Sequence, residues 1–424
     1  MKEYLKELPQ GIFRLIKLAQ DISSTLNYNV YLVGGFVRDL LLRVKNLDLD
    51  MVVEKEGIGF AEEFAKRLNA RIIRHKRFGT ATLVINSDFK VDIATTRKET
   101  YRCPASLPQV SLGTLRDDLF RRDFTINAMA IQIGPDNFGR LIDFFGGRDD
   151  LKKERIRVLH NLSFIDDPTR ILRAIRFEQR YNFKIESKTI KLLKEAVKLG
   201  MLKRVSPHRL RDEIILLLKE KEPLKNISRL NKLTGFGFID PALSLSEDAY
   251  KFLKKIKKEI AWFKKEYPDL RPIDTWLVYF IGLIDCLTLA KVKRLGIRFA
   301  FCRADRIRMI SYKKQLSKVI KTLSLRRISA WRLFRILQPL SYETILLIKA
   351  KSKNKDVNRH IKEFFDTYHG IRVSLDGNDL KNLGLPPGPL YQRIFERILK
   401  EKLKGRLKTR QQELLFVKRI LRLE

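Results

Sequence analysis

Two features close to the N-terminus combine residue types that suit chemistry on phosphates. Gly34 and Gly35 open a segment with helical spacing, and Asp48 and Asp50 follow it, two residues apart. Side chains two apart in a strand point to the same face, so both carboxylates can share divalent cations while Leu49 faces the core. Two magnesium ions about 4 Å apart can activate a hydroxyl and steady a leaving pyrophosphate. The spacing therefore predicts Asp48 and Asp50 as catalytic metal ligands, with Mg²⁺ as the cofactor.

The glycine pair lets the backbone approach a triphosphate closely, and the N–H groups that open the helix carrying Arg38 would point toward it. Neither feature is specific alone, since Gly-Gly often marks a tight turn and Asp-x-Asp a solvated edge. Their order, strand, Gly-Gly, helix and Asp-x-Asp strand, is the signature of the polymerase-beta-like nucleotidyltransferases. Residues 34–42 resemble the version found in class II tRNA nucleotidyltransferases (CCA-adding enzymes) and bacterial poly(A) polymerases.

The resemblance continues in residues 91–101, which look like the family's next strand. Asp92 alternates with apolar neighbours there, as in a half-buried strand. It is a candidate third catalytic carboxylate beside the metals. The alternative is that Asp92 caps a turn or pairs with Arg97 or Arg38.

The segment 118–130 is similar to the family's Arg-Arg-Asp motif almost letter for letter. In the family this motif contributes ribose and phosphate contacts, so the resemblance implies that Arg122, Asp123 and Asn127 bind the nucleotide, with Asp123 at the ribose. The planar fork of an arginine suits phosphate at any working pH. Arg38 and Arg122 are therefore predicted to position the triphosphate together with Gly34 and Gly35. The bland alternative is a surface cluster of ion pairs.

Residues 166–177 resemble the family motif that reads the incoming base. Asp166 or Asp167 is predicted to cap a helix, with Asp167 and Arg170 projecting from one face. Arg173 and Arg176 follow on the same segment and are predicted to bind the nucleotide as well. The alternative is a helix start with an ion pair between residues three apart.

The pairing of a carboxylate with a guanidinium explains how such a motif selects bases. Cytosine and adenine each present an amino donor beside a ring-nitrogen acceptor, which a carboxylate and a guanidinium complement. Guanine and uracil reverse both polarities and would leave buried groups unpaired, at roughly 1–3 kcal/mol each. The motif thus implies selection of C and A by protein groups.

Residues 206–218 resemble the motif that ends the family's neck, and Arg209 and Glu213 are predicted to brace the base-reading helix without a catalytic role. The chain departs from the family pattern at two places. Arg43 stands where glycine is usual, which affects the turn into the carboxylate strand, and Asp166 stands where glutamate is usual. Neither departure removes a proposed catalytic group.

The composition agrees with an RNA partner. The 424 residues include 87 Lys and Arg against 49 Asp and Glu, giving a formal charge of +38 and a pI of about 10.2, which favours a polyanionic ligand. The three cysteines are unclustered, so neither a zinc site nor a disulfide framework is predicted, and a cytoplasmic location fits. The first seven residues are charged throughout, so no export signal is predicted, and the longest apolar run is too short to span a bilayer.

Helical periodicity dominates after about residue 215, so the predicted fold class is an α/β head of the polymerase-beta-like type, a mixed sheet with helices, followed by an all-α neck, body and tail. The predicted domains are a catalytic head (1–145), a nucleobase-reading neck (146–215), a body (216–330) and a tail (331–424). Body and tail carry basic stripes suited to RNA phosphates. The Pro- and Gly-containing stretch 102–116 is predicted to be a mobile loop, which in this family affects the switch from C to A addition.

The resemblance implies a template-independent enzyme that extends the 3′ end of tRNA with C and A, using CTP and ATP, and that holds the acceptor stem and T arm along its helical part. No membrane or protein partner is predicted. A CC-adding or A-adding specialist and a poly(A) polymerase share these motifs and remain alternatives. A non-catalytic basic RNA-binding protein is the alternative from another class, although it would gain nothing from Asp48 and Asp50.

Overall fold

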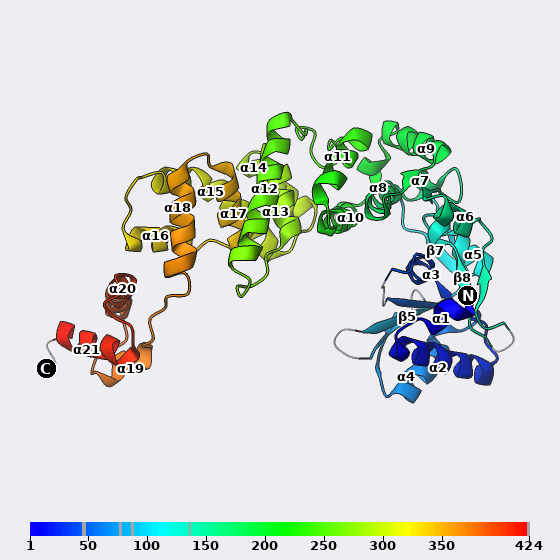
Figure 1. The fold of residues 1–424 in the computed structure, drawn as a ribbon, viewed down its shortest axis with the longest axis horizontal. Helices are drawn as coiled ribbons and strands as arrows, with labels where there is room; N and C mark the ends of the chain where they lie inside the picture. The colour runs from blue at the N-terminus through cyan, green and yellow to red at the C-terminus, as the bar shows by residue number, and fades with distance from the viewer. Residues whose placement is uncertain (45–47, 76–78, 86–88, 135–136, 422–424) are drawn as a thin grey trace. The chain divides into compact units, whose positions relative to one another are not determined.

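The computed structural model describes residues 1–44, 48–75, 79–85, 89–134 and 137–421. The chain forms two compact units, Met1–Pro241 and Ala242–Glu424. The first unit begins as an α/β fold and continues as helices, and the described part of the second unit is helical (Figure 1). The predicted fold class is confirmed. The domain boundaries within these two units remain predictions.

A seven-stranded sheet forms the core of the α/β part. Its strands are β1 (Val30–Val33), β2 (Leu49–Val53), β3 (Arg71–His75), β4 (Thr80–Val84), β5 (Lys90–Thr95), β8 (Ala130–Gln132) and β9 (Arg140–Ile142). They lie in the order β3-β4-β5-β2-β1-β8-β9. The β2–β5 pair is parallel and the other neighbouring pairs are antiparallel. The sheet is therefore mixed, as expected.

Side chains alternate between the two faces along each strand, and helices pack on both faces of this sheet. Helices α2 (Gln10–Leu26) and α4 (Gly57–Leu68) pack together beside the sheet (Figure 1). On the opposite face, Tyr31 and Val52 pack against α5 (Leu115–Phe120). Residues two positions from Val52 in β2 share this second face, which places Asp50 on it.

A hairpin occupies part of the predicted loop 102–116. Strand β6 (Arg97–Thr100) pairs antiparallel with β7 (Gln109–Leu112). The prediction of a loop was therefore wrong for residues 109–112, since the Pro and Gly residues around them only mark the ends of the strand.

The helical part of the first unit holds α6 (Gly147–Lys152), α7 (Ser163–Asp166), α8 (Thr169–Tyr181), α9 (Ser187–Lys198), α10 (Pro207–Lys219) and α11 (Pro223–Thr234). A two-residue parallel pair, β10 (Arg155–Ile156) with β11 (Lys184–Ile185), adds a small strand element. Helix α8 packs against α10 and α11. This packing fixes the helix that carries the predicted base-reading residues.

The described helices of the second unit are α12 (Glu247–Glu266), α13 (Thr275–Leu283), α14 (Leu289–Arg298), α15 (Arg303–Leu323), α16 (Ala330–Leu337), α17 (Tyr342–Lys351), α18 (Lys355–Glu363), a π-helical turn η4 (Phe364–Tyr368), α19 (Gly377–Asn382), α20 (Pro389–Leu403) and α21 (Arg410–Leu421). Helix α13 is buried along its whole length among α12 and α17. The apolar run found in the sequence thus forms a core helix. Among the described residues, no helix is both long and apolar enough to cross a membrane.

Gly147 and Gly11 differ in how closely other atoms pack around them, so alanine substitutions at these two positions test the packing of the first unit. A Cβ at Gly147 would lie 2.2 Å from the carbonyl oxygen of Thr125, whereas Gly11 in α2 has nothing within 4 Å. We expect Gly147→Ala to lower the free energy of unfolding by about 2 kcal/mol or more. Gly11→Ala should raise it by about 0.5–1 kcal/mol, because alanine favours helix. Thermal unfolding of the two variants checks this, and equal melting temperatures would contradict it.

Candidate active site

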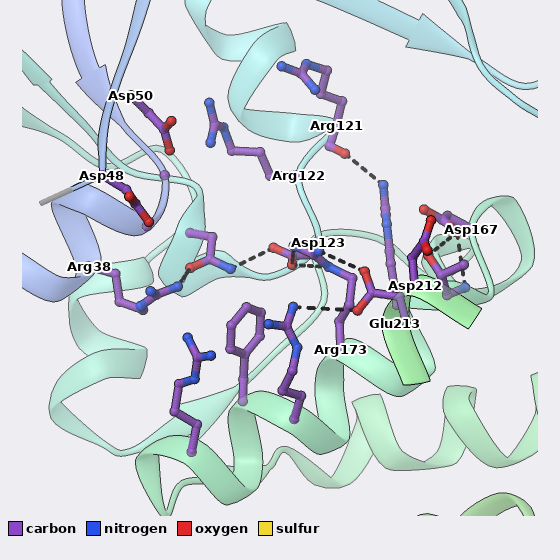
Figure 2. Close-up of a pocket in the computed structure, with 18 of the residues that line it drawn as sticks. Arg38, Asp48, Asp50, Arg121, Arg122, Asp123, Asp167, Arg173, Asp212 and Glu213 are labelled. Atoms are coloured by element: carbon purple, nitrogen blue, oxygen red, sulfur yellow. Dashed lines mark hydrogen bonds and ion pairs between the residues drawn. The ribbon is translucent and has the colours of Figure 1, made fainter. Parts of the chain in front are cut away.

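A cavity of about 1030 Å³ in the first unit brings the predicted site residues together. Every predicted residue except Asp92 lines it: Gly34, Gly35, Arg38, Asp48, Asp50, Arg122, Asp123, Asn127, Asp167, Arg170, Arg173 and Arg176. Figure 2 shows Asp48 and Asp50 facing Arg122, with Asp123 and Arg173 between them and Asp167. Residues spread over 143 positions of the sequence, from 34 to 176, therefore share one cavity.

The two carboxylates that are candidate metal ligands, Asp48 and Asp50, lie at the start of β2. Asp48 directly precedes the strand and Asp50 lies within it. Asp50 is the register partner of Asp92 on β5, and the Thr82 hydroxyl donates to Asp92 at 2.5 Å. Asp92 lines a smaller adjoining cavity of about 260 Å³ that also includes Asp50. Asp92 is therefore beside the metal-ligand candidates, not among the residues of the main cavity.

Asp50 has the electrostatic character of a cation ligand. Burial raises the pKa of this carboxyl to about 6, Arg122 opposes that rise, and the neighbouring charges of Asp92 and Asp48 add to it. Carboxylates crowded in this way repel one another, and a bound cation relieves the repulsion.

The turn before α3 (Gly35–Leu41) requires glycine. Gly34 has a φ of +69°, and a Cβ there would lie 2.6 Å from Nη1 of Arg122 and 3.6 Å from Oδ2 of Asp50. The absent side chain leaves space for the Arg122 guanidinium beside the carboxylate. Arg122 is also held by the buried Asp118 at 3.0 Å. A basic group is thus fixed between the glycine turn and the carboxylates.

Arg38 is more enclosed than predicted. Its side chain is 5% exposed and pairs with Asp39 through Nε and Nη2 at 2.8 and 2.9 Å. Its Nη1 donates to the Oδ1 of Asn127 at 2.5 Å. The guanidinium lies over the rings of Phe177 and Tyr181. Arg38 therefore fixes the floor of the cavity and presents little free surface to a ligand.

Asp123 joins the head to the helical part of the same unit. Its Oδ1 accepts from the amide of Asn127 at 2.8 Å, and its Oδ2 accepts from Nε and Nη2 of Arg173 at 2.8 and 2.6 Å. Arg173 also reaches Glu213 at 3.2 Å. Burial alone would raise the pKa of Asp123, but the charge of Arg173 and the hydrogen bonds from Asn127 and Arg173 outweigh it and lower the pKa to about 2.

Asp167 and Arg170 do not pair with each other. Oδ1 of Asp167 accepts from the backbone N–H and hydroxyl of Thr169 at 3.1 and 2.6 Å and from Arg209 at 2.8 Å. Among the described residues no donor contacts its Oδ2. Arg170 donates to the Ser163 hydroxyl and to the backbone carbonyl of Arg121, both at 2.7 Å. The side chains of Asp167 and Arg170 are therefore held in place, while Oδ2 of Asp167 and the remaining N–H groups of Arg170 are available to a ligand.

The predicted helix cap and brace are partly confirmed. Asp167, not Asp166, makes the turn before α8, and Pro168 occupies the cap position without a side-chain bond. Ser206 occupies the cap of α10 but its side chain does not cap the helix. Arg209 and Glu213 of α10 do hold Asp167 and Arg173, as the sequence predicted for this motif.

Arg180 and Tyr101 are among the cavity residues that the sequence analysis did not single out. Arg180 lines the cavity and pairs with Glu220. It continues the series of residues 173 and 176 at helical spacing, so periodicity could have found it. Tyr101 also lines the cavity, its hydroxyl donates to Glu99 at 3.3 Å, and no spacing pattern in the sequence marked it.

Comparisons with known proteins agree with this geometry. The family described as "Poly A polymerase head domain" matches residues 30–157. The family described as "Probable RNA and SrmB- binding site of polymerase A" matches residues 182–244. The first match covers the sheet and the carboxylates, and the second begins at the end of α8.

Two relatives extend over nearly the whole chain. The A-adding tRNA nucleotidyltransferase of Geobacter sulfurreducens is 40% identical over 421 residues, which cover 98% of this chain and 48% of that protein. The protein of the same name from Halalkalibacterium halodurans is 31% identical over 412 residues, covering 96% of this chain and 92% of the relative. The chain belongs to the tRNA nucleotidyltransferase family. The resemblance read from the motifs is confirmed, and the chain spans about half the length of the Geobacter relative.

A solved structure of this family has the same fold. The Thermotoga maritima CCA-adding enzyme complexed with tRNA matches with a TM-score of 0.74 and 34% identity, covering 100% of this chain and 98% of the other. The likeness therefore includes the second unit, of which the two family matches cover only residues 242–244.

The low pKa of Asp123 predicts how stability depends on pH. The pKa of Asp123 lies below its ordinary value of 3.8 because the folded protein favours the ionised carboxylate. The ion pair of Asp123 with Arg173 therefore adds about 2 kcal/mol to the free energy of unfolding above pH 4, and this contribution is lost as the pH falls toward 2. Asp123→Asn should therefore be less stable than the wild type by about 2–3 kcal/mol at pH 7, and the difference should shrink below pH 4. Urea unfolding at pH 7, 4 and 3 measures it.

Asp212→Asn is the matched control, since the Asp212 side chain is 58% exposed and should change stability little. Wild-type stability of Asp123→Asn at pH 7 would contradict the role given to the buried pair.

Proposed function

We propose that this protein is a tRNA nucleotidyltransferase that adds C and A residues, wholly or in part the CCA sequence, to the 3′ end of tRNA, using CTP and ATP without a nucleic-acid template. The observation that carries the proposal is the sharing of one cavity by two carboxylates, Asp48 and Asp50, and a carboxylate–guanidinium set, Asp167 and Arg170. The first pair suits phosphoryl transfer, and the second suits base selection.

The donor set at β2 fits Mg²⁺. Among the described residues no three His, Cys, Asp or Glu side chains are grouped as a complete metal cage. Mg²⁺ is commonly held by one or two carboxylates together with substrate phosphates and water, and Asp48 and Asp50 supply that number. When bound, the ion would lower the pKa of the attacking hydroxyl and neutralise charge on the phosphates. Asp92 would tune the charge of Asp50 from the next strand.

Other residues of the cavity bind the triphosphate or hold the site in shape. Gly34 and Gly35 admit the triphosphate close to the backbone, and Arg122 offers a guanidinium beside Asp50. The 3′ hydroxyl of the RNA attacks the α-phosphorus, the bond to pyrophosphate breaks, and the hydroxyl proton passes to solvent. No covalent enzyme intermediate is needed. Arg38, Asn127 and Asp123 act by holding one another, and a ribose contact by Asp123 remains a prediction.

Base selection follows from the unused atoms of the anchored pair. Oδ2 of Asp167 can accept from the amino group of cytosine or adenine, and the remaining N–H groups of Arg170 can donate to the ring nitrogen. Thr169, Arg209 and Arg121 prevent either side chain from rotating to satisfy the reversed polarity of guanine or uracil. Arg173 and Arg176 support this helix through Glu213.

The tRNA partner is supported by charge and by the solved relative. The chain carries a formal charge of +38, and basic helices suit the backbone of an A-form acceptor stem and T arm. An A-adding specialist is the second candidate function, because both relatives described above carry that name.

Nucleotide incorporation tests the proposal. Three tRNA transcripts, ending at the discriminator base, after C and after CC, would be offered labelled CTP or ATP with magnesium. CC and A addition indicates the full activity, A addition only after CC indicates the A-adding specialist, and C addition alone indicates the CC-adding specialist. Long A tails on every transcript would indicate a poly(A) polymerase instead.

Replacing Asp48 and Asp50 together with alanine is the control for chemistry. We expect incorporation to fall by about 10³-fold or more, because the metal loses its protein ligands, while tRNA affinity stays within about twofold or improves. No incorporation by the wild type on any transcript would contradict the proposal and leave an RNA-binding protein.

Asp167→Ala separates base selection from chemistry. We expect the KM for both ATP and CTP to rise about 10–100-fold, since the amino group of the base loses its acceptor. The Kd for tRNA should not change. Asp166→Ala is the matched control, because Asp166 does not line the main cavity. Steady-state kinetics measures both variants, and equal KM values would remove Asp167 from the base site.

A further inference from the structure

The second unit contains a smaller pocket of about 370 Å³ that the function proposed above does not use. Its walls come from the 338–341 connection before α17, from the first residue of that helix, and from the first residue of η4 and the residue that follows η4. Arg271 and Arg372 close it from two other segments. All of these residues belong to the unit Ala242–Glu424, and both family matches end before the first residue of this pocket, Arg271.

The lining of this second-unit pocket is rich in donors and contains no carboxylate. It presents the guanidinium groups of Arg271 and Arg372, the imidazole of His369, the amide of Gln338 and the hydroxyl of Ser341. The cavity of the first unit, by contrast, is lined by acidic and basic side chains together. A pocket with donors and no acid selects an anion.

Arg372 is the available cation of the pocket. It is exposed, and within the described part of the chain it forms no salt bridge. Its charge acts with burial to lower the pKa of His369, which places the guanidinium near that ring. A guanidinium without a carboxylate partner keeps its paired donors for a ligand.

The rest of the pocket is held in place before any ligand binds. Arg271 makes a two-pronged pair with Glu343 at 3.0 Å on each side, and Glu343 is fully buried. The Tyr342 hydroxyl lies 2.6 Å from Nε2 of His369. The π-helical turn η4 ends beside His369, whose backbone N–H donates to the Phe364 carbonyl at 2.7 Å. Such turns often mark functional sites, because they cost helix regularity.

We propose that the second-unit pocket binds a backbone phosphate of the RNA substrate, with Arg372, Gln338 and Ser341 as its donors. The proposal rests on the RNA partner given above. A nucleobase is a poorer occupant, because Arg271 already lies over the Tyr342 ring at 4.5 Å and covers that face. A backbone phosphate needs only donors, which this lining supplies.

Two substitutions in the pocket and one outside it test this site. Arg372→Ala should weaken tRNA binding about tenfold and reduce the slope of log K against log salt by about 1. Gln338→Ala should weaken it about fivefold without changing the slope, because a neutral amide releases no counterion. Arg332→Ala is the control, since Arg332 is an exposed arginine of α16 outside the pocket lining, and its effect should stay within about twofold.

Filter binding at several salt concentrations measures all three variants, and melting temperatures confirm folding. Wild-type affinity for Gln338→Ala, or equal losses for Arg372→Ala and Arg332→Ala, would overturn the site and indicate diffuse attraction. Stabilisation of the protein by inorganic phosphate that Arg372→Ala abolishes, with unchanged tRNA affinity, would also overturn it and indicate a small-anion site.

The incorporation assay keeps this inference apart from the proposed function. Arg372→Ala should incorporate nucleotides at the wild-type kcat when tRNA is saturating, with a raised KM for tRNA. A wild type that binds tRNA through the pocket but incorporates nothing would overturn the proposed activity and leave the pocket standing.

Discussion

The ion pair between Asp123 and Arg173 is the interaction on which the candidate active site depends. Asp123 belongs to the segment that follows the carboxylate-bearing strands, and Arg173 belongs to α8, which carries predicted base-reading residues. Their contacts at 2.6 and 2.8 Å join these two parts through a carboxylate that is buried away from water. Because an unpaired buried charge costs several kcal/mol, each part holds the other at a fixed distance and angle. In the proposed function, this arrangement lets the head bind the triphosphate and α8 bind the base of the same nucleotide.

Buried carboxylates paired with basic side chains also occur in the second unit. Glu343 is fully buried and forms ion pairs with Arg271 and Arg308. Glu413, also buried, accepts from backbone N–H groups at residues 374 and 375 and from Lys402. In a chain with so large an excess of positive charge, these few carboxylates hold basic segments together against their mutual repulsion. Arginines outside these pairs, such as Arg372, are the groups that we propose contact RNA.

Local motifs were predictable from sequence because they act over a few residues. The glycine turn, the carboxylates two apart on one strand and the Asp167–Arg170 spacing each follow from backbone periodicity. What sequence could not give was which partner each side chain takes across the fold. Arg38 was expected at the triphosphate but is enclosed by Asp39 and Asn127, and Arg170 is anchored by a backbone carbonyl at residue 121. The pairing of residues 109–112 with β6 was hidden by flanking Pro and Gly.

A double-mutant cycle on nucleotide incorporation tests the central claim most directly. It compares kcat/KM for Asp123→Asn, Arg173→Met and the double variant with that of the wild type. If the pair acts as one unit, each single change already loses most of the effect, and the double variant should be about 30-fold more active than the product of the single losses, a coupling of about 2 kcal/mol. Losses that simply multiply would contradict the account and assign the two residues independent roles.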